Sequence, residues 1–504
     1  SKLLFEGPIG KNEKSSFVFS GKTSYLDKTS DLFYKEPVLF FDDKGLPYSF
    51  TDLYGKLSLH GDNGSKFNFF GFNFQDKVDY ENISELKWNS NGLGGEFILI
   101  PGGSPVLIEG NFAYSSYNIS LDEEASPTRE SGITGFNMGF DFTYFNPRGK
   151  IKYGFDIHGF ETNFLTYNSV NSPITQNENT SEFSAYVNYQ YNKNRLIIEP
   201  GFRVQKYTLG VSPEPRLGVK FIANERLRLK LASGLYSQNI LSTSSDRDVV
   251  NLFSGIISSP EEIPLQADGT SYEDKFQKAR HIIVGFEYDV NRFVDFQLEG
   301  YIKDFTQLTN INRNMTSNDD PSFIIESGMA KGMDALVKFN GRKIYLWMVY
   351  SLGLITRDDG IREYSPHFDR RHNINFVSSY KFGSKNDWKV DGRWNFGSGF
   401  PFTQTQGFYE NLTFSDGINT DYTSDNGSLG IEYAELNSGR LPYYHRLDFS
   451  ISKTTELSKN TTLDITASVT NVYNRENIFY FNRVKYERVN QLPLMPSLGV
   501  SLSF

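Results

Sequence analysis

The sequence predicts an all-β fold: one large antiparallel transmembrane β-barrel, with residues 1–504 as a single domain. Three observations favour it. Amphipathic strands recur along the whole chain, short turns alternate with long polar stretches, and aromatic residues are abundant although the mean hydropathy is low. The 44 Phe and 30 Tyr coexist with a mean hydropathy of −0.45. A barrel reconciles these values because only every second residue of a strand faces lipid.

The last strand shows the alternation most clearly. Over the final seven residues, small or polar residues separate the apolar Leu498, Val500, Leu502 and Phe504. A period of two indicates a strand, and one apolar face with one small or polar face suits a wall between lipid and a wet lumen. An edge strand of a soluble sandwich fits these seven residues equally well, so the other strands decide.

The strongest evidence for a barrel lies between residues 226 and 231. There three leucines alternate with the cations Arg226, Arg228 and Lys230. Three unpaired cations on the buried face of a soluble sheet would be very costly, whereas a water-filled or plugged lumen accommodates them. The segments 296–303 and 447–452 alternate in the same way. No long amphipathic helix pattern occurs, so we expect a nearly all-β protein.

Composition excludes several classes of protein. No stretch approaches the roughly 18 consecutive apolar residues of a membrane helix. The chain has no Cys, which excludes disulfides, thiolate metal sites and cysteine nucleophiles. The formal net charge of −9 gives no sign of a nucleic-acid partner. The first residues lack the features of a signal peptide, so we expect the numbering to begin at a mature or internal position.

Short turns and long polar stretches alternate along the chain. The turns are rich in Gly, Asn, Asp, Pro and Lys and lie at 10–13, 61–64, 101–104, 146–149, 192–194, 223–225, 289–291, 340–342, 383–386 and 458–460. The long stretches, which we expect to be loops, lie at roughly 27–45, 121–131, 165–180, 238–278, 307–323, 356–366, 403–440 and 475–485. Short turns on one side and long loops on the other are typical of outer-membrane barrels.

The turns and the final strand together predict about 21 strands. The first strand and the last strand both run toward the side of the short turns, so they cannot close an antiparallel barrel against each other. Bacterial single-chain barrels have even strand numbers. We therefore expect one further strand before Ser1 and about 22 strands in the complete barrel, the size of the plugged transporters.

Several stretches resemble the barrel region of TonB-dependent outer-membrane receptors, in the branch found in Bacteroidota. Their order and spacing carry the resemblance, which covers the whole chain. They are 3–9 with 16–21, 213–217, 236–239, 368–373, 397–403, 441–448 and 471–475. In that family the glutamate-glycine-proline stretch, here Glu6-Gly7-Pro8, lies in the second barrel strand, which agrees with the strand count.

The resemblance implies a barrel of the Gram-negative outer membrane that imports a scarce substrate with energy from TonB. Outer-membrane lipid, TonB and the barrel-assembly machinery are the implied partners. TonB would act through an N-terminal plug, but the plug would precede Ser1, and this chain departs from the family there. The assembly machinery would recognise the final strand by Leu498, Val500, Leu502 and Phe504. The resemblance implies no cofactor.

Two other functions stay open. One is a receptor-like barrel that serves as a structural or docking subunit of a larger outer-membrane complex, with a surface lipoprotein among its candidate partners. The other is a passive pore. We do not expect an enzyme, because the sequence lacks a His-Glu-x-x-His motif, a Gly-x-Ser-x-Gly motif and a phosphate-binding glycine loop. The identity of the substrate cannot be read from the sequence.

Two charged clusters are the candidate contacts for substrate or plug. They are Asp369, Arg370, Arg371 and His372, and Tyr443, Tyr444, His445 and Arg446. The alternative is that both clusters form lumen-lining ion pairs that hold the wall and loops in place. Because side chains alternate along a strand, we expect Arg370 and His372 to face opposite to Asp369 and Arg371.

Metal and stacking sites are weaker hypotheses. His367 and His372 are too isolated from further ligands for zinc. The loop 416–427 offers oxygen ligands to Ca²⁺ but lacks the EF-hand spacing, so we expect a solvated loop and no metal site. Aromatic residues in or beside the loops either stack on a sugar or peptide or form the interfacial girdle; they are Tyr34, Phe40, Phe41, Phe408, Tyr409, Tyr422, Tyr443 and Tyr444.

Overall fold

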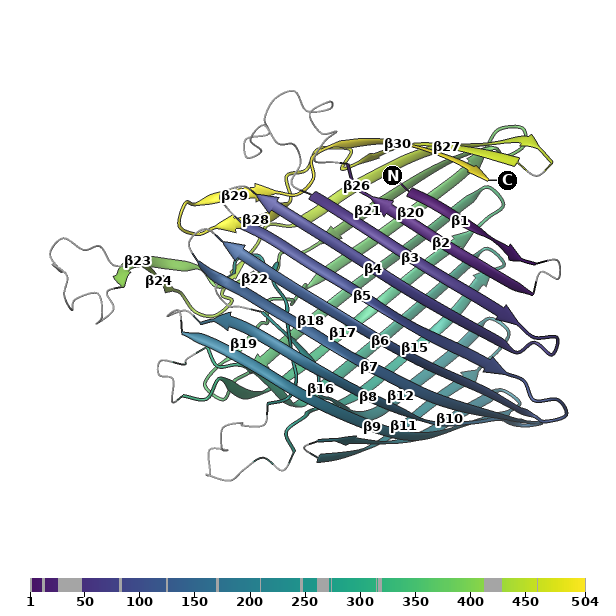
Figure 1. Ribbon diagram of the computed structural model, residues 1–504, viewed down its shortest axis with the longest axis horizontal. Helices are drawn as coiled ribbons and strands as arrows, with labels where there is room; N and C mark the ends of the chain where they lie inside the picture. The colour runs from purple at the N-terminus through teal and green to yellow at the C-terminus, as the bar shows by residue number, and fades with distance from the viewer. Residues whose placement is uncertain are drawn as a thin grey trace.

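A computed structural model describes most of the chain. The described residues are 2–10, 14–25, 48–80, 84–123, 126–168, 172–208, 210–244, 248–260, 272, 274–313, 315, 320–411, 428–459 and 461–503. Over these ranges one antiparallel sheet of 22 strands curls into a barrel (Figure 1). Among the described residues, no helix is long and apolar enough to cross a membrane.

The strands of the barrel follow one another in chain order around the wall. The first half comprises β1 (Lys2–Ile9), β2 (Ser15–Thr23), β3 (Tyr48–His60), β4 (Lys66–Tyr80), β5 (Ser84–Leu99), β6 (Val106–Glu123), β7 (Ser126–Asn146), β8 (Gly149–Tyr167), β9 (Pro173–Lys193), β10 (Leu196–Tyr207), β11 (Gly210–Ile222) and β12 (Leu227–Gln238). The second half comprises β15 (Gln277–Asn291), β16 (Val294–Ile311), β17 (Phe323–Asn340), β18 (Ile344–Asp358), β20 (His372–Phe382), β21 (Trp388–Gly397), β26 (Tyr444–Ser458), β27 (Thr461–Thr470) and β30 (Met495–Ser503).

The strand count agrees with the prediction. The 22nd strand of the sheet is the two-residue β19 (Glu363–Tyr364), which pairs only with the end of β18. Without it, the wall has the 21 strands that the turns predicted. The fold class is therefore confirmed as all-β, with one large antiparallel sheet.

The first and last strands run in the same direction, toward the short turns (Figure 1). Among the described residues, β1 pairs with β2 and β30 pairs with β27, and no ladder joins β1 to β30. Neighbouring residues of β1 are exposed on both faces, with Leu3 at 54% and Leu4 at 45%. The strand expected before Ser1 stays a prediction, and Phe504 lies outside the described residues.

Two stretches expected to be loops are strands instead. β6 and β7 run through most of residues 121–131, with only 124–125 undescribed between them, and β8 and β9 take up most of 165–180. Their polar composition was misleading because it marks contact with water, which a strand also meets once it rises above the membrane. The wall formed by β4 to β9 is therefore taller than the sequence predicted.

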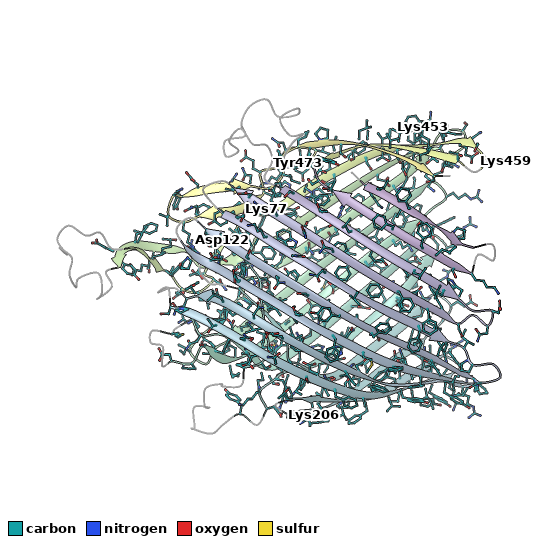
Figure 2. The ribbon with its side chains drawn as sticks, viewed as in Figure 1. Lys77, Asp122, Lys206, Lys453, Lys459 and Tyr473 are labelled. Atoms are coloured by element: carbon teal, nitrogen blue, oxygen red, sulfur yellow. The ribbon has the colours of Figure 1, made fainter. Side chains whose placement is uncertain are left out.

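Short strand pairs lie within the long connections on the other side from the short turns. They are β13 (Leu241–Thr243) with β14 (Gly255–Ile257), β22 (Pro401–Phe402) with β25 (Gly439–Arg440), β23 (Thr405–Asn411) with β24 (Ser428–Tyr433), and β28 (Ile478–Asn482) with β29 (Glu487–Asn490). Figure 2 marks the two ends of the barrel, because the labelled Asp122 lies at the end with the long connections and Lys459 lies at the end with the short turns. We call the former end the mouth.

Candidate functional site

The lumen wall carries paired charges. Glu287 of β15 binds Arg228 at 2.8 Å and Lys220 at 3.1 Å, and it also pairs with Lys230. On the opposite face of the same wall, Leu229 is 44% exposed. The cations of β12 therefore face inward, as predicted, although Arg226 lies in the turn that precedes the strand.

The connection between β12 and β15 folds into the mouth. Ser131 of β7 accepts a hydrogen bond from the backbone N–H of Ile256 at 2.8 Å. Gln176 of β9 binds Ser258 twice, with its amide oxygen and its amide nitrogen, both at 2.9 Å. The hydroxyls of Ser258 and Thr162 of β8 are 3.2 Å apart. Residues 255–258 thus lie along the inner face of three neighbouring strands, and we call the described residues 239–244 and 248–260 the infolded loop.

An apolar cluster lies inside the mouth, between the wall and the loops. Phe253 and Ile257 of the infolded loop are almost completely buried, together with Leu121 and Ile174 of the wall. The loop approaches closely because Gly255 has no side chain: a Cβ there would lie 2.2 Å from the ring of Phe164. Burial of these side chains stabilises the loop in its folded-in position.

One ionic contact joins the infolded loop to two other parts of the mouth. Arg129 of β7 binds Asp248 at 2.8 Å and Glu123 of β6 at 2.7 Å, and its side chain is 5% exposed. The hydroxyl of Tyr480 in β28 donates to Glu123 at 2.7 Å. Burial and the Glu123 carboxylate raise the pKa of Tyr480, so its proton stays in this contact. We call Glu123, Arg129, Asp248 and Tyr480 the mouth lock.

A second buried cluster holds the connections on either side of β17 and β18. Glu326 has no exposed side-chain area and pairs with Arg313 at 3.0 Å and with Arg357 at 3.4 Å. The hydroxyl of Tyr364 donates to both Glu326 oxygens at 2.9 Å. Arg313 also binds Asp359 at 2.8 Å. The β16–β17 and β18–β20 connections are therefore joined through one carboxylate.

His367 joins the β18–β20 connection to Ser244 of the infolded loop. The Ser244 hydroxyl lies 2.9 Å from Nδ1 and 3.1 Å from Nε2 of the ring. Burial, together with the positive charge of Arg357, lowers the pKa of His367 to about 4. The neutral ring is thus favoured when the loops are packed.

We expect this contact to weaken in acid. When the loops open, His367 regains an ordinary pKa near 6.5, so the open state binds more protons and the contact loses stability as pH falls from 6.5 to 4. Hydrogen exchange of residues 241–244 and 364–369 should therefore quicken between pH 7 and pH 5. His367→Gln should exchange at a rate that changes less over this range, after correction for intrinsic exchange. A wild-type contact that is equally protected at both pH values would contradict this prediction.

Within the first predicted cluster, Asp369 is the centre of a buried ionic contact. Asp369 is fully buried; it binds Arg440 at 2.5 Å, lies 3.6 Å from Arg371, and accepts the Ile355 N–H at 3.2 Å. Sequence reasoning missed Arg440, because it lies 71 residues from its partner. These contacts tie the start of β20 to β18 and β25, so they support the wall.

Arg370 and His372 do not face the same way, contrary to the prediction. The Arg370 guanidinium lies over the rings of Phe400, at 4.1 Å, and Tyr444, at 5.7 Å, on the lumen side. His372 lies on the outer face, where its Nδ1 is 3.0 Å from the Tyr350 hydroxyl. β20 begins only at His372, so the alternation of a strand does not extend back to Arg370.

The second predicted cluster divides between the two faces of β26. Tyr444 and Arg446 face the lumen, and Arg446 binds Asp448 at 2.9 Å. His445 faces outward, with its Nδ1 2.8 Å from the Tyr473 hydroxyl, and Tyr443 is 62% exposed. His372, Tyr443 and His445 thus lie on the outer face, and contact with substrate or plug stays a prediction for both clusters.

Gly399 marks a close approach of backbones beside this cluster. A Cβ at residue 399 would lie 1.6 Å from the carbonyl oxygen of Leu441. We expect Gly399→Ala to destabilise the β22–β25 pair by about 1–3 kcal/mol or more, as in other overpacked sites. Limited proteolysis near residues 398–403 should detect the loosened segment. Gly360→Ala is an unsuitable control because of its positive φ, but Gly102→Ala meets no atom within 4 Å and should leave proteolysis unchanged.

Other predicted sites fall partly outside the described residues. The loop 416–427, with the Ca²⁺ hypothesis, and Tyr34, Phe40, Phe41 and Tyr422 lie there. Within the described ranges, no group of three or more His, Asp or Glu side chains is placed to hold a metal ion. Phe408 and Tyr409 are exposed on β23.

Comparison with known proteins gives similarity of structure only. No protein-family model matches the sequence, and no curated protein matches it. Among solved structures, P. aeruginosa FpvA in complex with a heterologous iron–pyoverdine has a TM-score of 0.67 at 11% identity, over 99% of this chain and 69% of that chain. The ferric-catecholate import receptor Fiu of E. coli K12 has a TM-score of 0.67 at 10% identity, over 100% and 79%.

A third match supports the same assignment of fold. The FrpB iron transporter of Neisseria meningitidis has a TM-score of 0.64 at 12% identity, over 100% of this chain and 78% of that chain. These structures are receptors and transporters, not enzymes, and they do not test the Bacteroidota lineage, which stays a prediction. This chain has the barrel fold of the TonB-dependent outer-membrane receptors.

Proposed function

We propose that this barrel belongs to an active importer of the Gram-negative outer membrane, energised by TonB. The loop that folds into the mouth carries the proposal. The infolded loop packs on the inner face of β7 to β9, and the mouth lock joins it to β6 and β28. A loop held inside the mouth by a few separable contacts suits a receptor that rearranges for its ligand more than a passive pore.

The energy would reach the barrel through an N-terminal plug, and one strand of the full-length protein would fill the seam between β1 and β30. Because β1 and β30 run in the same direction, one strand that is antiparallel to both could pair with each of them. Exposure of Leu3 and Leu4 on opposite faces of β1, and of residues 496–503 on both faces of β30, supports a missing neighbour there.

Iron chelates are the first substrate class to test. The printed descriptions of the matched structures name an iron–pyoverdine complex, a ferric catecholate and an iron transporter. Uptake of ⁵⁵Fe-labelled catecholate and hydroxamate chelates should be measured in cells that do or do not make the protein, with and without an uncoupler of the proton-motive force. Uptake that requires both the protein and the proton-motive force supports the proposal. Uptake that is the same with and without the uncoupler contradicts it.

The plug has a test of its own. The intact mass of the protein from its native membrane should lie well above the 57.5 kDa of this chain. A mass near 57.5 kDa would contradict an upstream plug and favour a docking subunit instead.

One observation favours that second function. The β23–β24 hairpin projects beyond the mouth (Figure 1), and Phe408, Tyr409 and Leu429 on it are each more than two-fifths exposed. Exposed apolar groups on a projecting hairpin suit contact with a surface lipoprotein or another subunit. Purification under mild detergent should then yield a stable complex from the wild type, and Phe408→Ser with Leu429→Ser should release the partner.

A further inference from the structure

The outer face of β2 to β9 carries a groove above the apolar part of the wall. Its volume is about 1070 Å³, and it crosses all eight strands. The floor is the backbone of one continuous series of cross-strand neighbours, which includes Phe50, Asp76, Trp88, Ile119 and Ser131. Their side chains turn to the lumen, so the residues before and after them form the two sides of the groove on the outside.

The side of the groove nearer the membrane is a row of amides. Gln75, Asn89, Asn118, Asn163 and Asn177 come from five strands, and the ladders place them beside one another, with Gly132 between Asn118 and Asn163. Gly132 leaves the space that both amides occupy, because a Cβ there would lie 2.4 Å from Asn118 Oδ1 and 2.7 Å from Asn163 Oδ1. We call this set the amide row.

The amide row has unused hydrogen-bonding capacity. Gln75, Asn118, Asn163 and Asn177 are exposed, and Asn118 donates one Nδ2 hydrogen bond, at 3.3 Å, to the Ser116 hydroxyl. Each amide offers two donors and an acceptor. A regular row of such groups matches a ligand that presents many hydroxyls.

The lysines beside the groove are neutralised by carboxylates, so the groove has little net positive charge with which to bind a phosphate. On its far side, Lys77 binds Asp79 at 2.9 Å and also pairs with Glu85, and Glu85 pairs with Lys87. Two cations are thus matched by two carboxylates within one cluster, to which the labelled Lys77 in Figure 2 belongs. The chemistry therefore favours uncharged hydroxyl groups over phosphate.

Its height above the membrane identifies the source of those hydroxyls. On the membrane side of the groove, the nearest strongly exposed apolar side chains are the cross-strand neighbours Leu93, Tyr114 and Phe136. Each lies four residues along its strand from the amide row, at Asn89, Asn118 and Gly132 respectively. Four residues span about 13 Å of strand, or about 10 Å of height at a tilt of 35–45°. Phospholipid headgroups extend only about 5–7 Å beyond the hydrocarbon, so a lipid must carry sugars to reach the groove.

We propose that this groove binds the saccharide part of a glycolipid in the outer leaflet of the membrane, with the amide row as its hydrogen-bonding side. The acyl chains of the lipid would lie against the apolar face below. The site is separate from the lumen, so it holds the barrel in its lipid surroundings and takes no part in transport.

The test compares lipids on the full-length protein in nanodiscs. Lipid A that carries a core oligosaccharide, lipid A alone and phosphatidylglycerol are added in turn, and native mass spectrometry counts the molecules retained per barrel. Core-bearing lipid A should bind at least about 10-fold more tightly than lipid A alone. The variant N118A/N163A/N177A should lose about 10-fold or more of this affinity, since it lacks several hydrogen bonds.

A matched control replaces amides on the lumen face of neighbouring strands: N111A/N137A/N188A should bind as the wild type does. If the triple variant fails to assemble, N163A alone should still lower affinity by about threefold, and the soluble core oligosaccharide should compete with the lipid. Equal binding of lipid A with and without its core, failure of the oligosaccharide to compete, or an equal loss in the control would overturn the proposal. None of these outcomes bears on energised uptake.

Discussion

Glu326→Ala is expected to release the connections on both sides of β17 and β18. The substitution leaves Arg313 and Arg357 largely buried, with 11% and 19% of their side chains exposed, and removes the carboxylate that both of them share. Breaking a buried ion pair from one side costs about 3–5 kcal/mol. Hydrogen exchange of residues 320–326 and 357–364 should rise by a factor of about 100 or more, while the strands near the short turns should be unaffected.

Glu363→Ala is the matched control for this prediction. Glu363 is also a carboxylate of the β18–β20 connection, but it is exposed, so its removal should change exchange little. If Glu326→Ala and Glu363→Ala behave alike, Glu326 does not hold the connections together.

Arg129→Ala is expected to free the infolded loop. Without the guanidinium, the carboxylates of Glu123 and Asp248, which are 16% and 12% exposed, lose their shared partner and are left partly buried without compensation. The apolar burial of Phe253 and Ile257 remains, so we expect local opening and not unfolding of the barrel. Exchange of residues 248–258 should increase by about 100-fold, which corresponds to about 3 kcal/mol.

Arg148→Ala supplies the control for the mouth lock, because Arg148 is an exposed cation in a short turn at the other end of the barrel. A second variant, Tyr480→Phe, removes only the hydroxyl that donates to Glu123 and should have a smaller effect, on the order of 10-fold. Unchanged exchange at 248–258 in Arg129→Ala would show that apolar packing alone holds the loop.

The two charged clusters that the sequence singled out show how far local patterns reach. Alternation correctly separates Arg446 from His445, because both lie within β26. It fails for Arg370, which precedes its strand and turns onto Phe400 and Tyr444. The partner of Asp369, Arg440, was not predictable, since no local pattern relates residues 71 positions apart.

The height of the wall was misjudged for a related reason. The stretch 121–131 is polar, and polarity was interpreted as a loop. In the structure, outward polar residues such as Asn118 and Glu130 belong to strands that rise above the lipid. Polar composition reports the surrounding solvent, while backbone pairing depends on the neighbouring strand.

The sequence by itself determined the all-β class, the 21 wall strands, the approximate positions of the short turns that the structure describes and the parallel direction of the two end strands. All of these follow from period-two alternation and turn chemistry, which act between residues close in the chain. Only the tertiary structure decided that a loop folds into the mouth, that Glu326 and the mouth lock join separate connections, and that an amide row crosses the outer wall. Tyr480 and Glu123 are 357 residues apart, and Ser131 and Ile256 are 125 apart; such contacts exist only because the closing of the sheet brings distant loops together over one lumen.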